Sequence, residues 1–303
     1  MDMSVSATQV ISALRFREIK PVLQAFDFPY AVIKGEALSL LAYGKLGQRT
    51  SGDIDLLLSK ENTKKAALIF EQYNFYRTNR SREHEILMRG FSHQITPYGK
   101  ITGLVYTEID INHDIFWGEY AGDKTSIDDF LSDAIEISLY NCNTFSLSPI
   151  KAFIQLLLHQ YRDMNSIYLL AARKKLNISA FRDIFYLLKN NINTIPLKEL
   201  YDLCDRLQVI PYIYYVLYYT NIVFPDAIIQ SYMHAFETEG GIELLNCYGL
   251  TNEERKTWKC DFRTRLNSDD IFQLIQCDLT AKDLAKVEYN KTMLSRKEKK
   301  NEK

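Results

Sequence analysis

Two aspartates, Asp53 and Asp55, stand at alternate positions of an apolar segment that continues through Leu56–Leu58. In a β-strand, residues i and i+2 point to the same face of the sheet. The two carboxylates are therefore expected to project together, and like charges this close are costly unless a cation lies between them. Oxygen ligands at this spacing suit Mg²⁺, which usually takes one or two carboxylates together with substrate phosphates. The pair predicts a magnesium site for phosphoryl chemistry.

A later segment offers a third carboxylate. Residues 103–116 alternate between apolar and polar side chains, as a half-buried strand does, and Glu108 and Asp110 fall on the polar face. A mixed sheet that placed this strand beside Asp55 would bring one of the two to the predicted metal site. Three carboxylates holding two metal ions could orient a triphosphate and stabilise both oxygens of an in-line displacement. The alternation alone does not choose between Glu108 and Asp110.

Glycines and basic residues stand on both sides of the aspartate pair. Lys34 and Gly35 follow a short apolar segment, and Arg49 and Gly52 precede Asp53. Glycine permits a positive φ and a close approach of the backbone to a ligand, although an ordinary turn needs the same freedom. Lysine and arginine can hold phosphate, pair with a carboxylate, or simply carry surface charge.

The elements that must position these residues follow from the hydrophobic periodicity. Helices are expected over 6–26, with Pro21 kinking or dividing the first, and over 36–43 and 61–73. Short strands are expected at 30–33 and 54–58, followed by two antiparallel strands, 85–97 and 103–116, joined at Pro97–Lys100.

From about residue 126 the pattern is helical almost throughout. Ser148 and Pro149 mark a helix start, and further helices are expected near 179–190, 197–206, 211–220, 226–237 and 268–285. The aromatic residues around Tyr212–Tyr219 are assigned to the core. We therefore predict an α+β fold in which a small mixed-sheet domain, 1–125, precedes an all-helical domain, 126–290, and a charged, disordered tail, 291–303.

Composition excludes several classes of protein. The net charge of −1 gives no overall field toward nucleic acid or membranes, and the longest apolar stretch, near 210–225, is too interrupted for a membrane span. The five cysteines are widely spaced and form no zinc-like pattern. Together with a first segment that lacks signal-peptide features, they predict reduced thiols in a cytoplasmic protein.

The motifs in combination resemble a known family. Lys34-Gly35-Glu36, the core Arg49-x-Ser51-Gly52-Asp53-x-Asp55 and the later Ile109-Asp110-Ile111 are similar to the bacterial uncharacterised nucleotidyltransferase family, of the DNA polymerase β-like nucleotidyltransferase superfamily. The resemblance covers 20–118 and extends more weakly to segments near 147–159 and 181–184. The sequence departs from many superfamily members at Glu36, where they carry Ser or Gly.

The resemblance implies a Mg²⁺-dependent nucleotidyltransferase, of EC 2.7.7 type, that moves a nucleoside monophosphate from an NTP, ATP included, to an acceptor and releases pyrophosphate. In that role 1–125 would be the catalytic domain and 126–290 a substrate or cap domain. The implied catalytic and metal-binding residues are Asp53, Asp55 and Asp110. The implied nucleotide-binding residues are Lys34, Gly35, Arg49, Ser51 and Gly52.

The acceptor is left open, because a fold does not define a substrate. A small molecule, a protein or tRNA would serve, but the near-neutral charge argues against a large nucleic-acid footprint, so tRNA is not favoured. No membrane partner is expected. The alternative of another class is a catalytically silent relative that binds a nucleotide or a partner.

Overall fold

The computed structural model describes residues 3–49, 51–78, 93–118, 120, 122 and 125–295. The chain divides into two compact units, each built from several chain segments. Unit 1 comprises Met1–Gly118, Lys124–Gln155 and Tyr186–Pro196, and unit 2 comprises Glu119–Asp123, Leu156–Phe185 and Leu197–Lys303.

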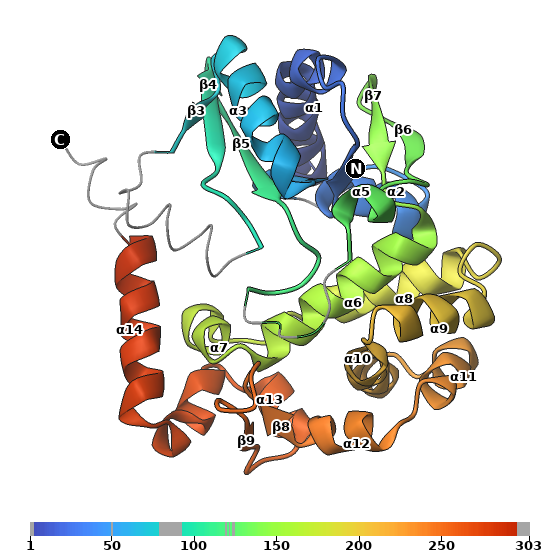
Figure 1. Cartoon of the computed structure of the whole chain (residues 1–303), viewed down its shortest axis with the longest axis vertical. Helices are drawn as coiled ribbons and strands as arrows, with labels where there is room; N and C mark the ends of the chain where they lie inside the picture. The colour runs from blue at the N-terminus through green and yellow to red at the C-terminus, as the bar shows by residue number, and fades with distance from the viewer. Residues whose placement is uncertain are drawn as a thin grey trace. The chain divides into compact units, whose positions relative to one another are not determined.

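Unit 1 is built on a mixed sheet whose strands lie in the order β3-β4-β5-β2-β1-β7-β6 (Figure 1). Strand β1 is antiparallel to β2 and parallel to β7, and β2 is parallel to β5. The predicted α+β class is confirmed. The strands are β1 (Tyr30–Ile33), β2 (Ile54–Leu58), β3 (Tyr76–Arg77), β4 (Tyr98–Thr102), β5 (Val105–Asn112), β6 (Ile135–Leu139) and β7 (Cys142–Ser146).

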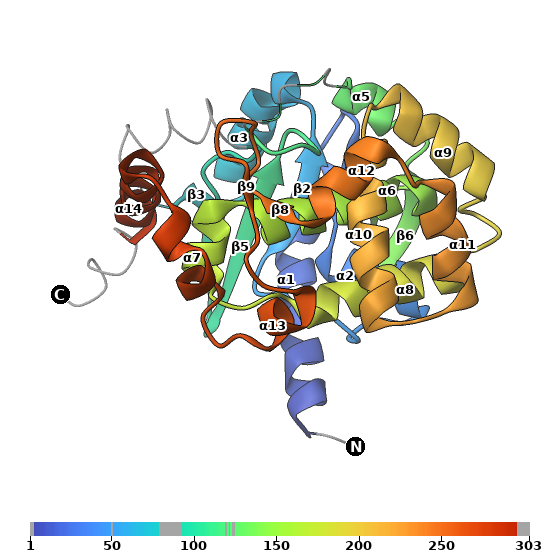
Figure 2. The same cartoon turned by 90° about the horizontal axis from the view of Figure 1, so that it is seen from below.

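One face of this sheet carries the core of unit 1. Val32, Leu56 and Ile111 come from three neighbouring strands, pair in register and are buried on the same face. They pack in one cluster with Ile19 of α1 and Phe70 of α3. The helices of this unit are α1 (Met3–Gln24), α2 (Gly35–Tyr43), α3 (Thr63–Gln72) and α5 (Ile127–Phe130), with the 3₁₀ turn η1 (Lys60–Asn62). Figure 2 shows α1 and α3 beside the sheet.

The turn between β4 and β5 lies later than predicted. Residues 79–92, which hold most of the strand predicted at 85–97, are outside the described residues. The predicted connection at Pro97–Lys100 is wrong, because Tyr98–Thr102 is itself strand β4. The chain turns instead at Gly103, whose φ of +60° is the conformation that two-residue hairpin turns need.

A second hairpin, β6–β7, occupies a segment that was expected to be helical. Its turn residues Tyr140 and Asn141 have φ values of 51° and 63°, so the turn has the positive φ angles of a type I′ connection without any glycine to signal it. The hairpin joins the sheet where Ser146 pairs with Val32. The prediction of helix almost throughout from residue 126 is therefore wrong over 135–146.

Unit 2 is helical except for a short strand pair, β8 (Cys247–Tyr248) with β9 (Lys256–Thr257). Of the aromatic residues at 212–219 that were assigned to the core, Tyr214, Tyr215 and Tyr219 are buried, and Tyr212 and Tyr218 are half-buried. The helix predicted at 268–285 is wrong in its first half, where two 3₁₀ turns, η2 (Ile271–Leu274) and η3 (Gln276–Asp278), precede the last helix.

The remaining helices of the chain are α6 (Pro149–Asn165), α7 (Ile167–Arg173), α8 (Ile178–Asn190), α9 (Leu197–Arg206), α10 (Ile210–Val223), α11 (Ala227–Ala235), α12 (Glu239–Leu245), α13 (Phe262–Asn267) and α14 (Ala281–Ser295). The disordered tail predicted at 291–303 is wrong over 291–295, which belong to α14, and the rest of it lies outside the described residues. Among the helices that the structure describes, none is long and apolar enough to cross a membrane.

Candidate active site

Strand pairing brings the predicted carboxylates together. In the antiparallel pair β1–β2, Asp55 lies opposite Ile33, and in the parallel pair β2–β5 it lies beside Asp110. Leu56 and Ile109 belong to the apolar core face, so the alternation of side chains places Asp55 and Asp110 on the other face. Strands β2 and β5 therefore lie side by side in a mixed sheet, as expected.

Asp55 is buried and holds two partners through one oxygen. Its Oδ1 accepts from Lys34 Nζ at 2.9 Å and from Asn112 Nδ2 at 3.3 Å. The Lys34 and Asp55 side chains are only 11% and 8% exposed, so solvent screens this ion pair weakly. Asn112, two residues after Asp110 on β5, was not singled out from the sequence, because an asparagine near a strand end gives no distinctive signal.

Lys34 adopts an unusual backbone conformation at the end of β1. Its φ of 58° and ψ of −154° lie near the region that is populated almost only by glycine, at a cost on the order of 1–3 kcal/mol. Gly35 follows with a φ of +42°, and a Cβ there would lie 3.3 Å from the Cβ of Ser51. The Lys34–Gly35 turn is therefore both strained and closely packed against the loop that carries Ser51.

Asp53 is oriented by the loop before β2. The Ser51 hydroxyl donates to Asp53 Oδ1 at 2.5 Å. Arg15 of α1 donates through Nη1 to the Ser51 carbonyl at 2.8 Å and through Nε to the Tyr106 carbonyl at 3.1 Å. Arg15 thus connects the loop to β5, and it could not be identified from the sequence because a charged residue on an amphipathic helix is ordinary.

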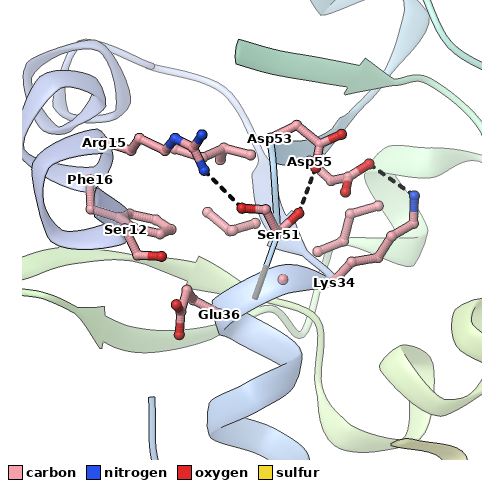
Figure 3. Close-up of a pocket in the computed structure, with 12 residues that line it drawn as sticks. Ser12, Arg15, Phe16, Lys34, Glu36, Ser51, Asp53 and Asp55 are labelled. Carbon is pink, nitrogen blue, oxygen red and sulfur yellow. Dashed lines mark hydrogen bonds and ion pairs between the residues drawn. The ribbon is translucent and has the colours of Figure 1, made fainter. Parts of the chain in front are cut away.

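Several of these residues line one pocket (Figure 3). Among the predicted site residues, Lys34, Gly35, Ser51, Asp53 and Asp55 form part of its lining. Helix α1 adds Ser12, Arg15 and Phe16. Arg49, which is half-buried, and the exposed Gly52 lie outside the lining, and Thr50 is outside the described residues.

Glu36 also lines the pocket, but its carboxylate is used for structure. Oε2 accepts from the Gly47 N–H at 2.9 Å, and Oε1 accepts from the Tyr140 hydroxyl at 3.0 Å. The residue is 4% exposed, and Figure 3 shows its carboxylate directed away from Asp53 and Asp55. Glu36, at which the sequence departs from the superfamily pattern, therefore links the start of α2, the loop after α2 and the β6–β7 turn.

The carboxylates crowd one another. Burial, together with the negative charges of Asp55, Asp53 and Glu108, raises the pKa of Asp110 from 3.8 to about 7, and Lys34 opposes the shift. Glu108 lies opposite Gly99 of β4, whereas the pairing with β2 begins at Ile109. Asp110, rather than Glu108, is thus the carboxylate level with Asp55.

The donor set has the chemistry that Mg²⁺ prefers, namely hard carboxylate oxygens with too little positive charge around them. Within the described residues, no group of three or more His, Cys, Asp and Glu side chains is arranged to hold a metal ion. Lys34 takes one oxygen of Asp55 instead. Asp53, Asp55 and Asp110 are the residues whose charges a divalent cation would balance.

Comparison with known proteins finds a similarity to a protein family and to a solved structure. A family model described as "Uncharacterised nucleotidyltransferase" matches residues 5–225. A solved structure, the crystal structure of an antigenic nucleotidyltransferase-like protein from Paracoccidioides brasiliensis, is 12% identical with a TM-score of 0.34, covering 60% of this chain and 75% of that chain. No curated protein matches the chain.

Proposed function

Because the chain belongs to the uncharacterised nucleotidyltransferase family, we propose that it is a Mg²⁺-dependent enzyme that transfers a nucleoside monophosphate from an NTP to an acceptor. The observation that carries the proposal is the register that sets Asp110 beside Asp55, with Asp53 two residues before Asp55. Mg²⁺, when bound by these three carboxylates, would supply positive charge to the polyphosphate. The proposal also places the domain in the DNA polymerase β-like nucleotidyltransferase superfamily.

The chain's own residues have distinct tasks in this proposal. The acceptor oxygen attacks the α-phosphorus, the bond to the bridging oxygen breaks, and pyrophosphate leaves. The acceptor proton passes to a carboxylate, and Asp110, which lies beside Asp55 on the neighbouring strand, is the residue proposed to receive it. The turn at Lys34 and Gly35 and the loop at Ser51 would hold the polyphosphate, since both line the pocket beside Asp53.

The acceptor is proposed only by its class, which is a small molecule, a protein or tRNA. ATP is one of the nucleotides to be tested as the donor. A net charge of −1 weighs against tRNA, because affinity for nucleic acid depends mainly on contacts between basic residues and phosphates.

The test is a transfer assay with the full chain. The protein is incubated with each of the four NTPs, labelled at the α-phosphate, with Mg²⁺ and separate pools of small molecules, proteins and tRNA. We expect label to move to one pool, and Asp53→Asn to abolish the transfer. Asp27→Asn, an exposed aspartate of the same unit, is the matched control and should behave as wild type.

Two outcomes would count against the proposal. Transfer at the wild-type rate by Asp53→Asn would remove the metal assignment. Nucleotide binding that needs no Mg²⁺ and gives no turnover with any pool would favour the silent relative instead.

A further inference from the structure

Lys34 is placed where a bound cation would be expected. Its Nζ lies 2.9 Å from Asp55 Oδ1, and both side chains are nearly buried. Of the described residues, only Asn112 also donates to Asp55, and it uses the same oxygen. The lysine thus supplies the positive charge at Asp55 in the protein without metal.

The backbone at this position adds an independent observation. A non-glycine residue at φ 58° and ψ −154° is costly, and strain of this kind persists only where the surroundings enforce it. Lys34 is held by β1 on one side, through the pairing of Ile33 with Asp55, and by α2 on the other. The chain therefore has a lysine at a position where glycine would have less backbone strain. The feature that a glycine could not supply there is the charged side chain.

We propose that Lys34 is an exchangeable counter-ion, an inference that rests on the proposed function. Without nucleotide it neutralises Asp55; when a nucleotide arrives with its metal, the metal takes over Asp55 and the ammonium moves to the polyphosphate. A divalent ion alone must displace the Lys34 ammonium from Asp55 and leaves that ammonium without a new partner. A metal–nucleotide complex also brings a phosphate, which accepts the displaced ammonium. Metal and nucleotide consequently bind as a pair, and metal alone binds weakly.

The charges at the site support the exchange. Like charges a few ångströms apart repel strongly where solvent screens them weakly, so an ammonium at Asp55 opposes a divalent cation at the same oxygens. A polyphosphate is a strong acceptor for the same ammonium. Lys34 contacts Asp55, and both residues line the same pocket as Ser51 and Asp53. A polyphosphate held in that pocket would therefore lie beside the Lys34 ammonium.

The experiment measures binding rather than turnover. Free Mn²⁺, the probe for the metal, is followed by electron paramagnetic resonance in titrations of wild type, Lys34→Gly and Lys34→Arg without nucleotide. Lys34→Gly removes the charge and relieves the backbone strain, so it should fold. We expect it to bind Mn²⁺ at least ~10-fold more tightly than wild type, whereas Lys34→Arg, which keeps the charge, should resemble wild type.

A second titration measures the affinity for each of the four NTPs with Mn²⁺ and in EDTA. The gain in affinity that Mn²⁺ gives should be ~10-fold smaller in Lys34→Gly than in wild type, because the variant has no ammonium for the metal to release to the phosphate. Lys64→Met removes an exposed lysine of α3 in the same unit and is the control for a general loss of charge; it should change neither titration.

The outcomes separate the two proposals. Equal Mn²⁺ affinity in wild type and Lys34→Gly, with normal Mn²⁺-dependent nucleotide binding by wild type, overturns the exchange and leaves the proposed function standing. Failure of wild type to bind any NTP together with Mn²⁺ overturns the proposed function, and the exchange with it. Opposite shifts in the two titrations support both.

Discussion

Asp53 and Asp55 stand two positions apart, yet their surroundings differ. Asp55 is paired with the nearly buried Lys34, whereas Asp53 accepts a hydrogen bond from the Ser51 hydroxyl. Asp53→Asn keeps an acceptor for Ser51 and removes repulsion among the carboxylates. Asp55→Asn instead leaves Lys34 without its charged partner, which costs about 1–3 kcal/mol.

We therefore expect both asparagine variants to lose transfer by at least ~100-fold, but only Asp55→Asn to be less stable than wild type. Thermal melts without metal, beside the transfer assay, check the two effects separately. Equal stability of the two variants would contradict the inequivalent surroundings.

Asp110 and Glu108 give the second contrast at this scale. The register sets Asp110 beside Asp55 and Glu108 beside Gly99. One step of i+2 along a strand moves a side chain by about 6–7 Å, which exceeds a Mg²⁺–oxygen bond of about 2.0–2.1 Å. Asp110→Ala should lose catalysis and retain some nucleotide binding, while Glu108→Ala should be milder. An inactive Glu108→Ala beside an active Asp110→Ala would refute this assignment.

The raised pKa of Asp110 gives a pH dependence. Because its folded pKa of about 7 lies above its ordinary value of 3.8, the native chain keeps this proton over a range in which the unfolded chain has lost it. The stability it contributes is fully present below the unfolded pKa and is lost as the pH rises through the folded one. From about pH 5 to about pH 8, the metal-free wild type should lose several degrees more of melting temperature than Asp110→Asn. Parallel curves for the two proteins would be evidence against a buried, crowded Asp110.

The sequence could indicate the carboxylates, since alternate aspartates in an apolar strand are costly without a function. It could not indicate Asn112 or Arg15, because their contacts with Asp55 and Ser51 depend on pairing between distant segments. The roles of all the predicted site residues, Arg49 and Gly52 included, stay predictions.

At the scale of elements, Glu36 joins three parts of unit 1. Its carboxylate receives the Gly47 N–H and the Tyr140 hydroxyl, so the first turn of α2, its following loop and the β6–β7 turn share one buried acceptor. Glu36→Ala should cost about 1–3 kcal/mol, since a buried donor is left unsatisfied. Tyr140→Phe removes only one of the bonds and should cost about 1 kcal/mol.

Urea unfolding curves of the two variants and of Glu61→Ala, an exposed glutamate in η1, provide the measurement. A Glu36→Ala variant as stable as the Glu61→Ala control would show that the acceptor is dispensable.

Periodicity located the elements that have clear hydrophobic repeats. The buried runs Tyr30–Ile33 and Ile54–Leu58 and the helix over Ile178–Asn190 lie where they were expected. The β6–β7 hairpin was missed because its turn has no glycine and its position depends on pairing with the distant β1. The start of β4 was missed because Pro97 precedes a strand and was taken for the turn itself.

At the scale of the whole molecule, the proposed function predicts stabilisation by ligand. A ligand that binds only the native chain adds about 2.7 kcal/mol at a hundredfold excess over its dissociation constant. We expect this increase with an NTP and Mg²⁺ together, and much less with Mg²⁺ alone, given the Lys34–Asp55 pair. Thermal melts with each NTP measure it, and an unchanged melting temperature with all four would favour the silent relative.

The strand order also constrains how the chain can fold during its own synthesis. Strand β1 leaves the ribosome well before its parallel neighbour β7, which ends only at Ser146. At about 5–20 residues per second, the delay is on the order of ten seconds. One side of β1 stays unpaired until β7 emerges, and unit 1 is complete only when Tyr186–Pro196 has also been made. A nascent chain of this protein therefore presents an open strand edge, and chaperones that shield such edges have the longest opportunity to act between the emergence of β1 and of β7.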